Sequence, residues 1–345
     1  MMEGFKGCYT ALVTPMNKHR QIYIDGLREL VDFQIAQGVS GILATGTTAE
    51  SPALPWKEHN RVIEGIFDQA DGRCTIIAGT GSNSTSEAMD ATAHAYSHGI
   101  RNFLLVDPYY NGPSSLEIRT EYVGPIAKRF PDAQIIPYVI PGRTGTKLLP
   151  QDLAMLHFEY GNVNAVKEAT GDLENMKLTR KYCGPDFIIL SGDDGMTYRM
   201  IKDPGVLASG VVSVASNVAP GPVQEMVDAL LNKEYVKAEA LAKALEPLFG
   251  MVTVKTQEDT RYGTRLVKAR NPLPFKTLMN ILCMPSGPCR QPLGKMTSEG
   301  LNEVVSRVRT VYKTNPEILE PIENFFDVKL EERLYNEYIL TGLHY

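Results

Sequence analysis

The chain has 345 residues, 43% of them hydrophobic, and a formal net charge of −5, which is typical of a globular protein that buries a large core. No basic block predicts nucleic-acid binding, no apolar run approaches the roughly 20 residues that span a bilayer, and the N-terminal segment lacks the apolar core of a signal peptide. Five scattered cysteines without zinc or redox spacing favour reduced thiols, so we expect a cytoplasmic protein with neither nucleic acid nor membrane as a partner.

One rhythm repeats from Cys8 to Ser216, in which short apolar runs alternate with longer segments of helical period. The runs are Tyr9–Thr14, Gly41–Thr45, Thr75–Gly79, Asn102–Val106, Ile135–Ile140, Asn164–Val166, Phe187–Leu190 and Gly210–Ala215. The helical segments are Ile24–Gln37, Lys57–Ala70, Thr85–His98, Leu116–Phe130, Pro150–Tyr160, Asp172–Tyr182 and Met196–Asp203. The runs are mostly continuous, as expected for strands covered on both faces. Eight such units, with no GxGxxG after the first strand, predict a closed α/β barrel of the (β/α)8 TIM type. An open, doubly wound sheet is the alternative.

After Ser216 the sequence predicts helices and no further strands. The helices are Val218–Leu231, Tyr235–Thr253, Pro274–Leu282 and Ser298–Tyr312. This pattern divides the chain into barrel strands and helices (1–216), the last barrel helix with a C-terminal helical region (217–312) and an extra tail (313–345). Because the tail is too apolar for a disordered segment, we expect it to dock on the barrel or on another subunit.

A single lysine, Lys167, follows the apolar run Val163–Val166 within the stretch VNAVKEATGD. At the carboxyl end of a barrel strand, it would lie where this fold keeps its chemistry. Desolvation by the flanking apolar chain would lower the pKa of the amine and leave it nucleophilic. The alternative is a lysine that only follows a strand and reaches solvent.

The segment Gly46–Ser51, GTTAES, follows the second predicted strand. Its glycine lets the backbone approach a ligand, and the hydroxyls of Thr47 and Thr48 with successive backbone N–H groups can hold a carboxylate. A strand-to-helix turn with hydroxyl caps would explain the same residues.

Tyrosines and an arginine follow the fourth and fifth strands. Tyr109 and Tyr110 lie in PYYN, whereas Tyr138 and Arg143 lie in YVIPGRTG. A phenol near Lys167 could relay protons during imine formation, and the planar fork of Arg143 suits a second carboxylate. Each tyrosine could instead pack in a core or an interface, and Arg143 could form a surface salt bridge.

The glycine-rich exits of the third and seventh strands, GTGSN and SGDD, fall at the same end of the barrel. Asp193 and Asp194 have no histidine or further carboxylate at ligand spacing, so we expect no metal. Hydroxyls, phenols, an arginine, glycines and one lysine thus converge on the carboxyl ends of the strands, which favours a catalytic site.

At these motifs the chain resembles the pyruvate-dependent Schiff-base (class I) aldolase and lyase family that includes dihydrodipicolinate synthase, N-acetylneuraminate lyase and keto-deoxy sugar-acid aldolases. The resemblance extends from about Gly7 to about Thr310 and rests on GTTAES, GTGSN, PYYN, YVIPGRTG, VKEATGD, LSGDD and GVVSVASNVAP, in that order. It implies an eight-stranded barrel with a C-terminal helical region, assembled as a homo-oligomer, usually a tetramer of two tight dimers.

The resemblance also implies roles for single residues. Lys167 would form the imine with pyruvate, and Tyr138 would shuttle protons, with Thr48 and with Tyr110 from the neighbouring subunit completing the relay. The substrate contacts implied are Thr47 and Thr48 with the pyruvate carboxylate, Arg143 with the carboxylate of aspartate semialdehyde, and Gly192 and Val212 beside pyruvate.

A regulatory site for lysine is implied at a further set of residues. Its members are Ser51, Trp56, His59, Asn83, Glu87 and Tyr109. Glu87 could pair with a lysine ammonium, or the set could simply fill a cavity at a dimer interface.

The expected reaction is condensation of pyruvate with L-aspartate 4-semialdehyde to 4-hydroxy-tetrahydrodipicolinate, without a separate cofactor, because the covalent lysine imine is itself the electron sink. A related aldolase or dehydratase acting on a sugar acid or a hydroxyproline-derived keto acid is the alternative enzyme. A non-catalytic, ligand-binding barrel is the alternative outside enzymes.

Overall fold

A computed structural model describes residues 4–345 and shows eight parallel strands that close into a barrel in chain order. The strands are β1 (Gly7–Ala11), β2 (Gly41–Ala44), β3 (Thr75–Gly79), β4 (Asn102–Val106), β5 (Gln134–Val139), β6 (Ala165–Glu168), β7 (Ile188–Ser191) and β8 (Gly210–Ser213). β1 pairs with both β2 and β8, which closes the sheet. The predicted (β/α)8 barrel is therefore confirmed, and the open sheet is wrong.

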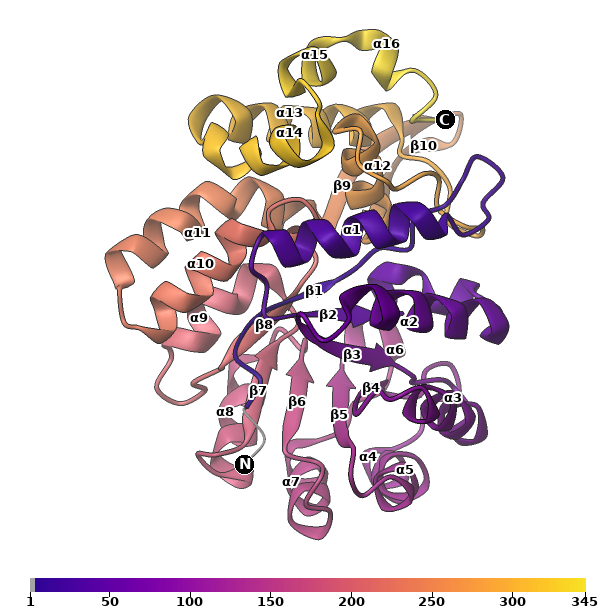
Figure 1. The fold of residues 1–345 in the computed structure, drawn as a ribbon, viewed down its shortest axis with the longest axis vertical. Coiled ribbons are helices and arrows are strands. Elements are labelled where there is room, and N and C mark those ends of the chain that lie inside the picture. Colours follow the sequence, from indigo (N-terminus) through magenta and orange to yellow (C-terminus); the bar gives the residue numbers. More distant parts are fainter. Residues whose placement is uncertain (1–3) are drawn as a thin grey trace.

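Helices follow the strands and cover the outside of the barrel (Figure 1). They are α1 (Ile24–Ala36), α2 (Trp56–Ala70), α3 (Thr85–Ser97), α4 (Ser115–Glu117), α5 (Gly124–Arg129), α6 (Pro141–Thr144), α7 (Pro150–Glu159), α8 (Leu173–Cys183), α9 (Thr197–Lys202) and α10 (Pro220–Leu231). Residues Ile118–Val123, between α4 and α5, are π-helical, so the predicted helix Leu116–Phe130 is continuous but not α-helical throughout. None of the helices formed by residues 4–345 is long and apolar enough to cross a membrane.

Alternation along the strands creates two separate cores, because successive side chains point to opposite faces. On β6, Val166 packs in the large core between barrel and helices, whereas Ala165 packs in a smaller core inside the barrel. Tyr138 of β5 and Val212 of β8 belong to this inner core. The residue after Val166 must therefore also point inward.

Beyond α10 the chain forms α11 (Tyr235–Phe249), β9 (Thr253–Thr260), β10 (Gly263–Arg270), α12 (Leu273–Ile281) and α13 (Ser298–Thr314). β9 and β10 pair antiparallel as a hairpin, so the prediction of no strand after Ser216 is wrong, and the predicted helix Tyr235–Thr253 ends earlier. In Figure 1 the arrows of β5 and β6 point toward the side on which β9, β10 and α12 lie.

The tail forms α14 (Glu320–Phe326), α15 (Leu330–Tyr335) and α16 (Glu337–Leu340). Phe325 and Phe326 stack on Phe33 of α1, with ring centroids 5.2 and 5.1 Å from its ring. Arg333 of α15 donates to the carbonyl oxygens of Ile281 and Asn280 at the end of α12. The tail thus packs on its own chain, and the division at residues 216 and 312 stays a prediction.

Candidate active site

Lys167 lies on the inner face of β6, where strand alternation requires it. Its side chain is only 4% exposed, so it does not reach solvent as a strand-end lysine on the outside would. Tyr138 is its direct partner in the register of β5 and β6. The Lys167 Nζ lies 4.0 Å from the centroid of the Tyr138 ring. The barrel thus brings an amine and a phenol together from neighbouring strands.

The surroundings of Lys167 disfavour its ammonium form. Burial is the main cause that lowers its pKa from 10.5 to about 7, and the Arg143 guanidinium acts in the same direction. The Asp194 carboxylate opposes this shift. Asp194 accepts hydrogen bonds from the Ser213 hydroxyl and from the backbone N–H groups of Val214 and Ala215, at 2.9 and 3.2 Å for the latter two. A substantial fraction of the Lys167 amine is therefore neutral near pH 7.

Gly192 leaves the space that the Lys167 side chain occupies. A Cβ at position 192 would lie 3.1 Å from Lys167 Cε and 2.9 Å from the Ala169 Cβ. Both distances are too short for an ordinary carbon contact, so a side chain here would displace the lysine. The glycine at the exit of β7 is thus explained by close approach rather than by a turn.

The GTTAES segment forms two short 3₁₀ helices, Thr47–Ala49 and Ser51–Ala53, after β2. Thr48 is buried, and its hydroxyl oxygen accepts a hydrogen bond of 2.9 Å from the Asn271 side-chain amide. Because that oxygen is held by a donor, the Thr48 hydroxyl proton is free to point elsewhere. The two threonines lie on the same wall of the cavity that contains Lys167.

A buried ion pair anchors this segment. Glu50 and Lys276 of α12 are fully buried, with 2.7 Å between Oε1 and Nζ. Lys276 also donates to the carbonyl oxygens of Thr14 and Pro288, and Glu50 accepts from the backbone N–H of Arg290. Both charges have several hydrogen bonds, which a buried pair requires to be tolerated. The C-terminal region thereby fixes the position of Thr47 and Thr48.

Tyr138 is a weak acid in this environment. Burial raises its pKa to about 12, although the Arg143 guanidinium and a hydrogen bond with Thr47 lower it. The phenol therefore stays protonated at neutral pH and can donate a proton. Arg143 itself is exposed at the mouth and donates to the Asn271 carbonyl oxygen at 3.0 Å. Among the described residues, it forms no salt bridge.

One cavity of about 400 Å³ gathers most of the predicted site residues. Those that line it are Thr47, Thr48, Tyr138, Arg143, Lys167, Gly192 and Val212. Tyr110 is not among them: it follows β4 with a φ of 78° and is 94% exposed. Within one chain, the structure therefore does not bring Tyr110 to Lys167.

A further wall of the cavity comes from the β9–β10 hairpin and the residues on either side of it, which the sequence did not predict. The residues concerned are Val252, Thr253, Lys255, Lys268, Arg270 and Asn271. Their strands carry polar residues on both faces, so they lack the apolar run that marked the barrel strands. The available signal was the turn at Tyr262-Gly263, where Gly263 has a φ of 107°, between two polar segments that contain one valine each.

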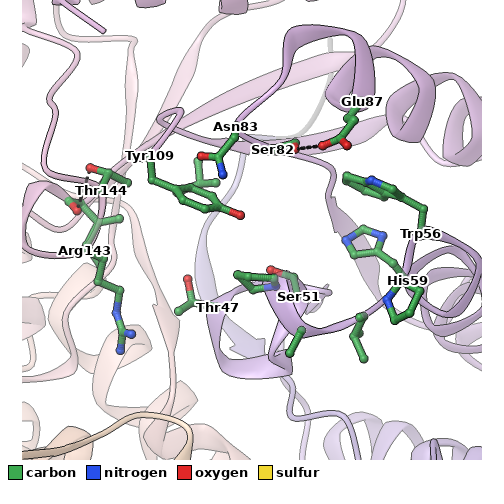
Figure 2. A pocket seen from close by; sticks show the side chains of 17 residues that line it. Thr47, Ser51, Trp56, His59, Ser82, Asn83, Glu87, Tyr109, Arg143 and Thr144 are labelled. Carbon is green, nitrogen blue, oxygen red and sulfur yellow. Dashed lines mark hydrogen bonds between the residues drawn. The ribbon is translucent and has the colours of Figure 1, made fainter. Parts of the chain in front are cut away.

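A second cavity, of about 620 Å³, lies beside the first and shares Thr47, Ile140 and Arg143 with it. It contains all the residues expected at a regulatory site, namely Ser51, Trp56, His59, Asn83, Glu87 and Tyr109 (Figure 2). In Figure 2 the Tyr109 ring extends into the space between Thr47 and Glu87.

Polar groups in this second cavity are partly unsatisfied. Burial lowers the pKa of His59 to about 4, so its ring is neutral at neutral pH, and its Nδ1 has no hydrogen-bond partner. The Trp56 ring lies 4.8 Å from it, between centroids. Glu87 accepts a hydrogen bond from the Ser82 hydroxyl. The cavity therefore offers the Glu87 carboxylate to a ligand, whereas the His59 Nδ1 is itself buried.

Within residues 4–345, no group of three or more His, Cys, Asp or Glu side chains comes together in a way that could hold a metal ion. Asp193 and Asp194 are both at the cavity, but Asp194 is occupied by its bonds to Ser213, Val214 and Ala215.

Known proteins resemble this chain over nearly its whole length. The model of the dihydrodipicolinate synthetase family matches residues 4–311. A 4-hydroxy-tetrahydrodipicolinate synthase of Methanococcus maripaludis is 40% identical over 291 residues, which are 84% of this chain and 93% of that protein. The dihydrodipicolinate synthase structure from Aquifex aeolicus has a TM-score of 0.81 at 34% identity, covering 92% of this chain and 100% of that one. The enzyme from Cyanidioschyzon merolae, solved with lysine bound, has a TM-score of 0.80 at 30% identity, covering 89% and 98%.

Proposed function

The chain belongs to the dihydrodipicolinate synthetase family, and from this premise we propose that its barrel condenses pyruvate with L-aspartate 4-semialdehyde on Lys167. It is a lyase of the 4-hydroxy-tetrahydrodipicolinate synthase type, which serves the synthesis of diaminopimelate and lysine. The observation that carries the assignment of residues is the Lys167 amine, buried with a lowered pKa beside the Tyr138 phenol.

In the first half of the reaction, the neutral amine of Lys167 attacks the ketone of pyruvate, and the carbinolamine loses water to give a protonated imine. The hydroxyls of Thr47 and Thr48, with nearby backbone N–H groups, hold the pyruvate carboxylate. Tyr138 donates the proton that the departing hydroxyl needs, because its phenol stays protonated at neutral pH.

In the second half, the protonated imine draws electrons, so a methyl proton is lost and an enamine forms. The enamine carbon attacks the aldehyde, whose carboxylate Arg143 binds at the mouth. The amine of the acceptor then attacks the imine carbon and displaces Lys167, which releases the cyclic product. No separate cofactor takes part in this route, because the imine supplies the electron sink.

We assign the second cavity to regulation by lysine. The Glu87 carboxylate suits an ammonium group of the ligand, and Asn83 and Tyr109 line the same cavity as further polar side chains. The relative from Cyanidioschyzon merolae was solved with lysine bound, which supports the same ligand for this chain. The shared residues Thr47 and Arg143 connect the cavity with the catalytic one.

We also propose that the chain acts as a homo-oligomer, a dimer or a tetramer. Tyr110 is almost fully exposed at the exit of β4 and lies outside the cavity of its own chain. A second copy would allow its phenol to join the relay of the neighbouring site.

The test is reductive trapping. Borohydride with pyruvate should attach the reduced pyruvyl group to Lys167 of the unmodified protein, and Lys167→Ala should abolish trapping, as measured by intact mass and peptide mapping. Lys177→Ala, which removes a lysine from the outer surface of α8, should trap like the unmodified protein. Trapping that persists in Lys167→Ala would contradict the assignment.

Steady-state rates at saturating pyruvate identify the acceptor. L-aspartate 4-semialdehyde should exceed sugar acids and hydroxyproline-derived keto acids in kcat/KM by at least about a hundredfold, since substrate discrimination is a difference in transition-state binding. The reverse preference would favour a related aldolase or dehydratase.

A further inference from the structure

The β9–β10 hairpin presents one of its two faces to the catalytic cavity. Strand alternation places Thr253, Lys255 and Gln257 of β9 on the same face, and the register pairs them with Arg270, Lys268 and Leu266 of β10. Of these, Thr253, Lys255, Lys268 and Arg270 line the cavity that contains Lys167. On the opposite face, Thr256 contacts Thr297 at the start of α13. The basic side chains thus face the reaction and not the supporting helix.

The charged side chains on the cavity-facing side of the hairpin are all positive. Lys255 and Lys268 are direct cross-strand partners, and a direct pair has its Cβ atoms about 5 Å apart, a distance at which like charges destabilise a hairpin. Neither lysine forms a salt bridge with any carboxylate among residues 4–345. An anion between the two ammonium groups would remove the repulsion.

The base of the hairpin is fixed to the turn that carries Arg143. Arg270 donates to the Gly142 carbonyl oxygen at 3.2 Å, and Arg143 donates to the Asn271 carbonyl oxygen at 3.0 Å. Partial desolvation of the guanidinium among these neighbours lowers the pKa of Arg143, and the positive charge of Arg270 acts in the same direction. Two arginines and two lysines therefore meet at the mouth.

Few carboxylates balance these four cations. Asp193 and Asp194 line the same cavity, but Asp194 is buried and hydrogen-bonded to Ser213 and the following backbone. An excess of positive charge at the acceptor end of the site remains, and it suits a carboxylate that arrives with the second substrate.

We propose that Lys255 and Lys268 of the hairpin bind the carboxylate of the acceptor aldehyde together with Arg143, and so determine which aldehydes the site accepts. The proposal rests on the proposed function, since it concerns the same condensation. The pyruvate end of the cavity, at Thr47 and Thr48, is held by Asn271 rather than by either lysine.

The test compares Lys255→Gln, Lys268→Gln and the double variant with Arg265→Gln as a control. Arg265 lies on the same strand as Lys268 but pairs with Glu258 on the other face, so its loss changes the charge equally without touching the cavity. Each single variant should raise KM for L-aspartate 4-semialdehyde at least fivefold, and the double variant more. KM for pyruvate and borohydride trapping with pyruvate should stay within twofold of the unmodified protein.

A second experiment tests whether Lys255 acts on the carboxylate of the acceptor. Succinate semialdehyde keeps the carboxylate, whereas its carboxamide analogue does not. Lys255→Gln should weaken competition by the first compound against L-aspartate 4-semialdehyde and leave competition by the second unchanged. Equal effects on both compounds would show that Lys255 does not act on the carboxylate of the acceptor, and would overturn the proposal.

The proposal is also overturned if KM for the aldehyde is unchanged in both single variants, if KM for pyruvate rises equally, or if Arg265→Gln has the same effect. A Lys255→Arg variant that restores KM would support it, because arginine keeps the charge. Absence of pyruvate trapping in the unmodified protein would instead overturn the proposed function, and this proposal with it.

Discussion

The burial of Lys167 serves its chemistry but lowers the stability of the fold. Its chemistry needs a neutral amine near pH 7, and burial inside the barrel supplies one by disfavouring the ammonium. The same burial costs folding free energy, because the unfolded chain carries this lysine as a hydrated ammonium. The barrel tolerates that cost at the one position where the lowered pKa is useful.

Replacing Lys167 with methionine should therefore stabilise the fold while it abolishes trapping by pyruvate. A lysine whose pKa falls from 10.5 to about 7 on folding destabilises the protein fully below pH 7, and the cost disappears as the pH rises from 7 to 10.5. Lys167→Met should gain on the order of 4 kcal/mol in free energy of unfolding at pH 7. Urea denaturation at equal protein concentration measures it.

The difference between the two proteins should shrink as the pH is raised from 7 toward 10. Comparison of the two proteins at each pH cancels the titration of other groups. A variant that is no more stable at pH 7, or whose advantage persists unchanged at pH 10, would show that Lys167 is not held neutral by burial.

At the scale of single elements, the sequence predicted the eight barrel strands, because a strand buried on both faces is a continuous apolar run. The eight barrel strands are short and apolar, and Lys167 and Tyr138 could be placed near their carboxyl ends without coordinates. That the two side chains share the inner face follows from the strand register, which only the closed barrel sets. Gly192 was placed beside pyruvate by resemblance, but its contact with Lys167 Cε depends on three-dimensional packing.

The hairpin and Asn271 could not be found in the same way. Only Val254 of the two hairpin strands is buried, so β9 and β10 show no continuous apolar run. Asn271 holds Thr48 from 223 positions away in the chain, a contact that no local pattern encodes. The acceptor end of the site is therefore the part that the sequence predicted least.

Helix α14 of the tail should contribute to the stability of the fold. Phe325 and Phe326 at the end of α14 stack on the fully buried Phe33, so α14 covers an apolar part of α1. Phe326→Ala should lower the free energy of unfolding by about 2 kcal/mol, less than in a fully buried core because Phe326 is partly exposed. Its kcat/KM should be unchanged, since α14 lies outside both cavities.

Tyr338→Ala is the matched control for the tail. Tyr338 belongs to α16 and is 89% exposed, so its loss should leave stability within about 0.5 kcal/mol of the unmodified protein. Equal stability of Phe326→Ala and Tyr338→Ala would mean that the packing of α14 contributes nothing to folding.

At the scale of the whole molecule, the site of one chain contains every predicted relay residue except Tyr110. In the single chain the Tyr110 phenol is exposed to water. If a symmetric partner covers it, each chain completes the other's site, and activity belongs to the assembly.

Two inactive variants should then rescue each other. Lys167→Ala lacks the nucleophile, and Tyr110→Phe lacks the phenol that crosses to the neighbour. A mixed dimer contains one site with neither change, so random reassembly of an equal mixture should restore about a quarter of the unmodified activity, because half the dimers are mixed and each has one complete site. The measurement is steady-state activity before and after the subunits are dissociated and reassembled together. Activity equal to the mean of the two separate variants would show that Tyr110 does not act across an interface, whereas recovery would assign the relay to two chains.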